Sequence, residues 1–258
     1  MRKEERHYLK CKDTYSKETK QDNSNISIYD LTLKTNPFPT DQIYLDQILS
    51  IKNKLDTLYQ DKTKYFNTSG LSSCLNDVFS LEKELKIIIN KYLVPYLEKN
   101  IFGCYVEPQK IKVYKTVNES LKEKLSWLWH FDNNIEEEIK VMIYFNNVDN
   151  NGPFKYLSKD NEAIKIEPTN SRHSLNRAIN WFKVFDLNWK GTRVPKNIIS
   201  SLKEKYNCKE VEVKGPLGTS ILFDNNILHK GTIPFEGFRY AMTLAFKPVD
   251  KKIIKWKY

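Results

Sequence analysis

Near its C-terminus the chain reads GTSILFDNNILHKG over residues 218–231 and FRYAMTLAF over residues 238–246. Both segments are rich in β-branched and aromatic residues, which predicts two strands separated by a turn. Because side chains alternate between the faces of a strand, Arg239 and Thr243 share one face with two alanines, and the opposite face is bulky. A small face that carries one cation suits a cavity for a compact carboxylate, since a buried arginine needs an anionic partner.

Similar strand patterns extend upstream to about residue 104. They predict strands near residues 111–115, 127–132, 139–146, 154–157, 163–167, 211–214, 219–223 and 238–246. Many short strands without crossover helices between them favour an antiparallel sandwich or barrel.

The chain has 258 residues, for which we expect a single domain over residues 1–258. A polar N-terminal segment, residues 1–35, should wrap the surface or be partly disordered. Residues 36–103 carry helical periodicity near 43–58 and 81–93 and form a helical flank, with Pro95 ending or kinking the second helix. Residues 104–250 form the β core, interrupted by an insertion at 168–209 that contains a helix near 195–206.

Composition restricts the possible partners. There are 42 basic and 32 acidic residues, a net charge of +10, but only six of the basic residues are arginines. Arginines and aromatics are not concentrated along one segment, so we expect no nucleic-acid partner. No segment is apolar enough for a membrane span and the N-terminus lacks a secretory pattern, which predicts a cytoplasmic protein with reduced cysteines. The oligomeric state is left open.

Two of the four histidines stand in informative contexts. In a strand over residues 127–132, His130 and Asp132 share a face with Leu128, and the three aromatic residues of the segment face the other way, toward the helices. His130 and Asp132 could then supply two ligands to one metal ion. His229 follows a strand and a turn and could supply a third.

The order of these motifs resembles that of the iron(II)- and 2-oxoglutarate-dependent oxygenases, in particular the phytanoyl-CoA dioxygenase family. The similar segments are WHFD at 129–132, VDNNGPF at 148–154 and LFDNNILH at 222–229, followed by Arg239 ten residues after His229. The resemblance covers about residues 105–247. It implies a mainly β fold with flanking α-helices, built on a double-stranded β-helix of the jelly-roll or cupin-like type, which agrees with the strand pattern.

The resemblance also implies a chemistry. His130, Asp132 and His229 would be the catalytic facial triad that ligates Fe(II), and 2-oxoglutarate and O2 would be the cosubstrates. Arg239 would hold the distal carboxylate of 2-oxoglutarate. The products would be succinate, CO2 and a hydroxylated substrate, because related halogenases have a small residue where this chain has Asp132.

Other residues of the cosubstrate and substrate regions are less determined. Tyr144 could donate a second hydrogen bond to the cosubstrate or be a core tyrosine, and Thr243 shares the inner face with Arg239. Asn133 and Asn134 could contact substrate or simply form a turn.

We expect the insertion to cover the cavity mouth, as long connections often do. It offers three arginines for an acidic group of a small-molecule substrate: Arg172, Arg177 and Arg193. Candidate substrates are a small polar metabolite, a sugar or glycan intermediate and an acyl compound. The alternative function is a metal-binding β-barrel or binding protein without catalysis, which would have no need of Arg239.

Overall fold

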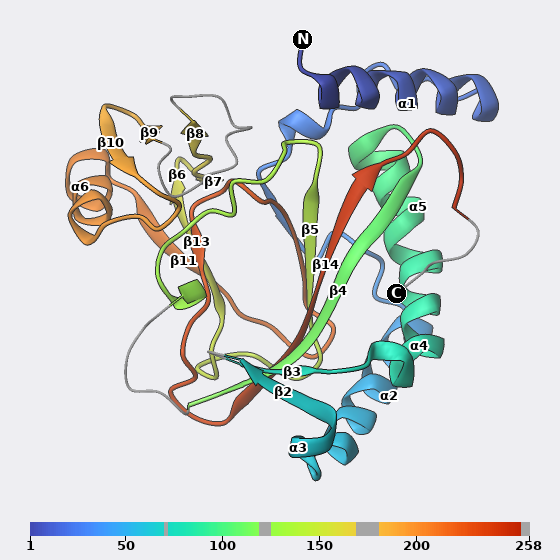
Figure 1. The fold of residues 1–258 in the computed structure, drawn as a ribbon, viewed down its shortest axis with the longest axis vertical. Helices are drawn as coiled ribbons and strands as arrows, with labels where there is room; N and C mark the ends of the chain where they lie inside the picture. Colours follow the sequence, from blue (N-terminus) through green and yellow to red (C-terminus); the bar gives the residue numbers. More distant parts are fainter. Residues whose placement is uncertain (70–71, 119–124, 169–180, 254–258) are drawn as a thin grey trace.

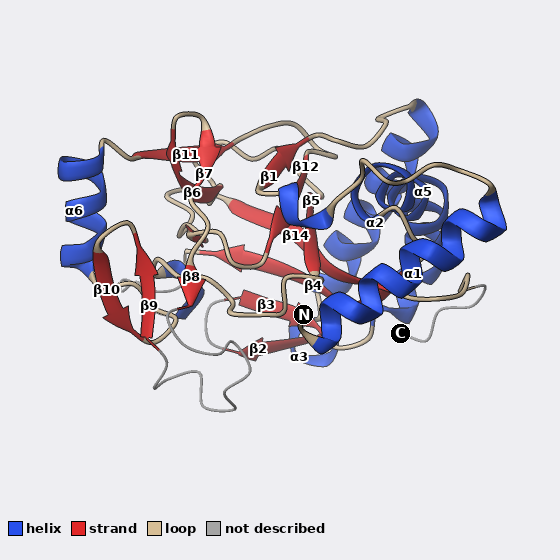
Figure 2. Ribbon diagram, turned by 90° about the horizontal axis from the view of Figure 1, so that it is seen from above, coloured by secondary structure: helices blue, strands red, loops and turns tan. Residues whose placement is uncertain are grey.

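A computed structural model of the chain describes residues 1–69, 72–118, 125–168 and 181–253. Its elements form layers: helices cover one face of a large antiparallel sheet, a smaller sheet faces the other side, and the insertion lies beyond the smaller sheet (Figures 1 and 2). No helix in these residues is long and apolar enough to cross a membrane.

The helices lie mainly in the N-terminal part of the chain. They are α1 (Lys3–Thr19), α2 (Gln42–Tyr59), α3 (Lys62–Tyr65), α4 (Glu82–Ile87), α5 (Val94–Leu97) and, in the insertion, α6 (Lys196–Tyr206). Turns of 3-10 helix occur at Ile28–Asp30, Val78–Leu81 and Leu125–Trp127. Asp41 begins α2 by accepting a hydrogen bond from the amide of Tyr44, as an N-cap residue does.

The second predicted helix continues past Pro95 because π-helical turns, Ile88–Leu93 and Glu98–Phe102, lie on both sides of α5. Proline has no amide hydrogen and its ring collides with the preceding turn of a regular α-helix. The wider π turns are the usual way to relieve such an interruption. The helical run ends at Gly103, whose φ of +63° favours glycine.

The large sheet has the order β1-β12-β5-β14-β4-β3-β2, with all neighbours antiparallel. Its strands are β1 (Leu33–Thr35), β2 (Phe66–Ser69), β3 (Ser72–Leu75), β4 (Val106–Val117), β5 (Ile139–Tyr144), β12 (Ser220–Asp224) and β14 (Phe238–Pro248). The long strands β4 and β14 run side by side through the centre (Figure 1).

The facing sheet is built around β6 (Phe154–Lys159), which pairs with β11 (Lys209–Val213), β13 (His229–Lys230) and β7 (Glu162–Ala163). A third sheet belongs to the insertion and contains β8 (Glu167–Pro168), β9 (Trp181–Val184) and β10 (Leu187–Lys190). Together the two main sheets form the antiparallel sandwich that the strand pattern predicts.

The alternation of side chains divides the core in two. On β14, Tyr240 and Met242 pack against the helices, whereas Ala241 faces the space between the sheets. On β5, Val141 faces the helices and Tyr144 faces the inner space. The face assignment predicted for residues 238–246 is therefore correct, and Arg239 and Thr243 point into the sandwich.

Two expectations differ from the structure. Residues 3–19 form helix α1, in which Tyr8, Cys11 and Tyr15 are buried. The hydroxyl of Tyr8 donates to the carbonyl of Phe102, which fixes α1 on the helical layer. The segment was expected to wrap the surface or be partly disordered, and a helix was not predicted because its many charges conceal this short stripe of buried residues. The buried stripe and the contacts of Arg2 with Glu136 and Glu137 hold the helix on the protein.

Residues 127–132 do not form the predicted regular strand. The segment follows a 3-10 turn at Leu125–Trp127. Its backbone pairs only through isolated bridges, between His130 and Arg193 and between His130 and His229. Trp129 and Phe131 pack against residues of the insertion, including Phe182 and Trp189, and not against the N-terminal helices. The aromatic residues thus anchor the insertion to the segment that carries His130.

Candidate metal centre

Backbone pairing brings the two histidines of the predicted triad together. The amide of His130 donates to the carbonyl of His229 at 2.9 Å, and the amide of His229 donates to the carbonyl of His130 at 2.9 Å. The amide of Asp132 donates to the carbonyl of Asn225, also at 2.9 Å. Potential ligand atoms of His130, Asp132 and His229 all lie within 4.8 Å of one another.

Both imidazoles are held in the tautomer that a metal requires. Nδ1 of His130 lies 2.8 Å from the carbonyl of Leu128, and Nδ1 of His229 lies 2.9 Å from the carbonyl of Ile227. A carbonyl oxygen can only accept, so Nδ1 must be protonated and Nε2 keeps its lone pair for a metal. Such hydrogen bonds on the far nitrogen are characteristic of metal-bound histidines.

Burial favours the neutral form of both rings. His130 is 4% exposed and His229 is 6% exposed, and burial lowers the pKa of His130 to about 3 and also lowers the pKa of His229. Phe154 stacks on the ring of His229 at 5.4 Å, and Phe223 contacts it edge-on at the same centroid distance. These aromatic rings exclude water from one side of the site.

Asp132 is ionised and held by a lysine. Burial opposes its ionisation, but its interactions with His229 and Lys140 lower its pKa to about 2. With His229 neutral, the permanent charge is that of Lys140, whose Nζ lies 2.5 Å from Oδ2 of Asp132. Two neutral imidazoles and one carboxylate are the donor set of the facial triad that binds non-haem iron(II).

Arg239 lies in the same cavity, of about 440 Å³, as the three ligands. It is 4% exposed, and Nη1 donates to the carbonyl of Gly152. Its guanidinium lies 5.9 Å from the ring centres of both Tyr114 and Tyr144, while Nε has no hydrogen-bond partner. No carboxylate of the described residues pairs with it, so the guanidinium is available to a bound anion.

Tyr144 lies beside Arg239, but its hydroxyl is already engaged. It donates to the carbonyl of Val213 at 3.0 Å and accepts from the amide of Phe154 at 2.9 Å. Burial raises its pKa to about 12. These contacts join β5 to the facing sheet and favour the interpretation of Tyr144 as a core tyrosine, whereas Thr243 lines the cavity with Arg239.

The remaining predicted contacts fall in different places. Arg193 lines the cavity, whereas Arg172 and Arg177 lie outside the described residues. Asn133 and Asn134 do not line it; Asn133 is buried with a φ of 52°, and Asn134 donates to Glu138 at 2.6 Å.

Lys140 was not predicted, although the sequence contained the signal. It lies on β5 four residues before Tyr144, the candidate for a hydrogen bond to the cosubstrate, and side chains four residues apart on a strand share a face. Alternation from Tyr144 would therefore have placed Lys140 toward the cavity also.

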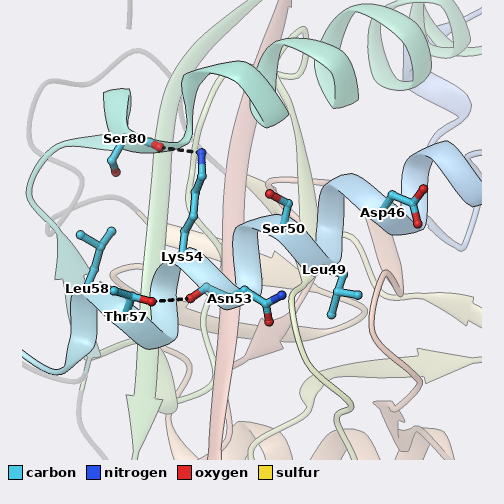
Figure 3. A pocket seen from close by; sticks show the side chains of 8 residues that line it. All are labelled: Asp46, Leu49, Ser50, Asn53, Lys54, Thr57, Leu58 and Ser80. Carbon is cyan, nitrogen blue, oxygen red and sulfur yellow. Dashed lines mark hydrogen bonds between the residues drawn. The ribbon is translucent and has the colours of Figure 1, made fainter.

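A second hollow, of about 650 Å³, lies along α2 (Figure 3). Lys54 donates to the carbonyl of Ser80 at 3.2 Å, and the hydroxyl of Thr57 donates to the carbonyl of Asn53 at 3.1 Å. These are contacts within the helical layer. The hollow holds no group of metal-ligating side chains among the described residues.

Comparison with known proteins identifies the fold. No family model matches the sequence, and no curated protein matches it. Among solved structures, the epimerase SnoN from nogalamycin biosynthesis is 10% identical, with a TM-score of 0.51 over 93% of this chain and 81% of that chain. EctD from S. alaskensis is 14% identical, with a TM-score of 0.54 over 85% and 73%. The carbocyclase SnoK is 8% identical, with a TM-score of 0.54 over 84% and 80%.

SnoN and SnoK are described as non-haem, α-ketoglutarate-dependent enzymes, and SnoN and EctD have been solved with iron bound. Structures of SnoN and EctD also contain the cosubstrate. The chain therefore has the double-stranded β-helix fold of iron- and 2-oxoglutarate-dependent enzymes. Within that fold it carries a converging His130, Asp132 and His229.

Proposed function

We propose that the protein is an iron(II)- and 2-oxoglutarate-dependent dioxygenase that hydroxylates a C–H bond of a small molecule and releases succinate and CO2. The observation that carries the proposal is the combination of three converging metal ligands with a buried arginine that lacks a carboxylate partner among the described residues. A metal-binding barrel without catalysis explains the three ligands but leaves the buried guanidinium uncompensated.

The donor atoms fit iron(II). His130 and His229 present unprotonated Nε2 atoms and Asp132 presents an ionised carboxylate, so no proton has to leave before a metal binds. Lys140 contacts Oδ2 of Asp132 and would keep the carboxylate ionised and oriented for a metal. Three protein ligands leave further coordination positions for cosubstrate and oxygen.

The cavity also fits 2-oxoglutarate. Nη1 of Arg239 is fixed by Gly152, so the unpartnered Nε side of the guanidinium can bind the distal carboxylate. The glycine is required, because its φ is +96° and a Cβ there would lie 2.8 Å from the carbonyl of Thr232. When bound, iron and 2-oxoglutarate activate oxygen to attack a C–H bond of the substrate.

Hydroxylation is favoured over halogenation because the carboxylate of Asp132 would fill the metal position that a halide would have to occupy. Substrates of the three kinds named above, a polar metabolite, a sugar or glycan intermediate or an acyl compound, are compatible with the cavity. The structurally similar SnoN and SnoK are an epimerase and a carbocyclase, which shows that this fold supports several outcomes.

The test is the release of succinate from 2-oxoglutarate by the Fe(II)-loaded protein under air. Slow substrate-independent release is expected for the wild type and none for His229→Ala. His7→Ala is a matched control, because His7 is exposed and lies on α1. Wild-type protein that binds neither iron nor 2-oxoglutarate would contradict the proposal.

A further inference from the structure

The cavity lining is strongly cationic. It contains the side chains of Lys112, Lys140, Arg193 and Arg239, and its only acidic member in the described part of the chain is Asp132. Cations that line one cavity repel one another, and the repulsion is greatest at Arg239, which is buried. The lining therefore favours bound groups with negative charge.

Iron and 2-oxoglutarate account for only part of this charge. Iron(II) together with Asp132 would carry one positive charge, and this charge and that of Arg239 would balance the doubly negative cosubstrate. Lys140 contacts Asp132, but the charge of that carboxylate is already counted with the iron, so Lys140 adds one positive charge that this balance does not cancel. Lys112 and Arg193 form no salt bridge with any described residue, although the charge of Asp132 acts on Arg193, and neither is assigned to iron or 2-oxoglutarate in the proposed site.

These two cations approach from different walls. Lys112 lies on β4, opposite Thr243 of β14 and two residues before Tyr114, so it belongs to the inner face of the large sheet. Arg193 comes from the insertion, and its backbone pairs with His130. Figure 1 shows β4 and the insertion on opposite sides of the sandwich. A molecule between them would lie next to the metal ligands.

The charged side chains are exposed, whereas the surface beside them is partly apolar. Lys112 and Arg193 are both exposed, which leaves them free to meet an incoming molecule. Leu125 is 56% exposed and lines the cavity together with the buried Trp127. A volume of about 440 Å³ is near the small end of the range for small-molecule sites.

We propose that the substrate is a small organic anion, a carboxylate or a phosphate monoester, and that Lys112 and Arg193 bind its anionic group. Leu125 and Trp127 then contact its carbon skeleton, with a C–H bond directed at the metal. This inference rests on the proposed function and specifies its substrate class. The same cations would draw anions into the cavity from solution.

The test is calorimetric titration of the Fe(II)-loaded protein, under anaerobic conditions and saturated with 2-oxoglutarate. Butyrate and butyl phosphate are the anionic probes, and butanamide is a neutral probe of similar size. At least one anion should bind about tenfold more tightly than butanamide, the factor that one charge-assisted hydrogen bond contributes. Which anion binds more tightly distinguishes a carboxylate from a phosphate substrate.

Variants assign the effect to the two residues. Lys112→Gln and Arg193→Gln should each weaken binding of the preferred anion about tenfold and leave that of butanamide unchanged. The matched controls are Lys110→Gln on β4 and Lys190→Gln on β10, because both lysines are exposed and neither lines the cavity. These controls should bind the anion as the wild type does.

Two results would overturn this inference but not the proposed function. One is that butanamide binds as tightly as both anions, and the other is that the control variants lose as much anion affinity as the Lys112 and Arg193 variants. In both cases 2-oxoglutarate would still bind. Failure of the wild-type protein to bind 2-oxoglutarate would overturn the proposed function and this inference with it.

Discussion

Replacing Arg239 by lysine tests the cosubstrate site most directly. The substitution keeps the positive charge but removes the planar fork of donors. In the structure Nη1 is committed to the carbonyl of Gly152, and Nε is the donor left without a partner. A lysine has a single Nζ, which would have to serve both the carbonyl and the cosubstrate carboxylate.

The expected loss corresponds to at least one hydrogen bond to a charged group, which contributes about 1.5–3 kcal/mol. The KM for 2-oxoglutarate should therefore rise about 10- to 100-fold, since each factor of ten corresponds to about 1.4 kcal/mol. Iron affinity should change little, because Arg239 is not one of the three converging ligands.

The assay is succinate formation at varied 2-oxoglutarate, with Fe(II) binding measured separately by titration. Arg6→Lys is the control, because Arg6 is exposed on α1. An unchanged KM in Arg239→Lys would refute the assignment of Arg239 to the cosubstrate. Loss of iron binding in parallel with 2-oxoglutarate binding would instead indicate a general disruption of the cavity.

Three further predictions concern the ligands and the core. Asp132→Ala should abolish hydroxylation, and product analysis in the presence of chloride should show whether any residual activity is chlorination; full hydroxylation by this variant would exclude Asp132 as a ligand. Tyr144→Phe leaves the carbonyl of Val213 and the amide of Phe154 without their partner, so urea unfolding should show a loss of about 1–3 kcal/mol. The KM for 2-oxoglutarate should stay within about twofold of wild type, since a large rise would assign Tyr144 to the cosubstrate. Burial raises the pKa of Glu98 from 4.5 to about 7, so the folded protein holds a proton that the unfolded chain releases between these values. Stability should fall as pH rises through this interval, and Glu98→Gln should flatten the dependence in urea unfolding at several pH values.

The parts of the fold that were predictable are those in which local pattern and tertiary environment agree. Residues 238–246 alternate between bulky and small side chains, and the structure places the bulky ones against the helices. The segment at 127–132 alternates equally well, yet it is not a regular strand. Its partners are single residues far away in the chain, Arg193 and His229, and no local pattern specifies such pairing.

For the metal centre, the sequence identified the residue types and their order. It did not reveal that His130 and His229 pair through their backbones, or that Lys140 holds Asp132. Both contacts depend on the register between strands that are distant in the sequence. A shift of one residue in that register would turn the side chains to the opposite face of the sheet. Lys112 and Arg193 could be related only after the fold had placed β4 and the insertion around one cavity.

The attachment of the insertion to the segment with His130 has an evolutionary consequence. The amide of Val194 donates to the carbonyl of Trp129 at 2.9 Å, and the amide of Phe131 donates to the carbonyl of Thr192 at 3.3 Å. The residues on both sides of His130 are thus bonded to the chain on both sides of Arg193. Loops on a rigid scaffold can usually be exchanged without disturbing the scaffold. Here a change in the backbone of the insertion would also move His130. Substrate selectivity, which we assign to Arg193, and metal binding through His130 are therefore expected to evolve together.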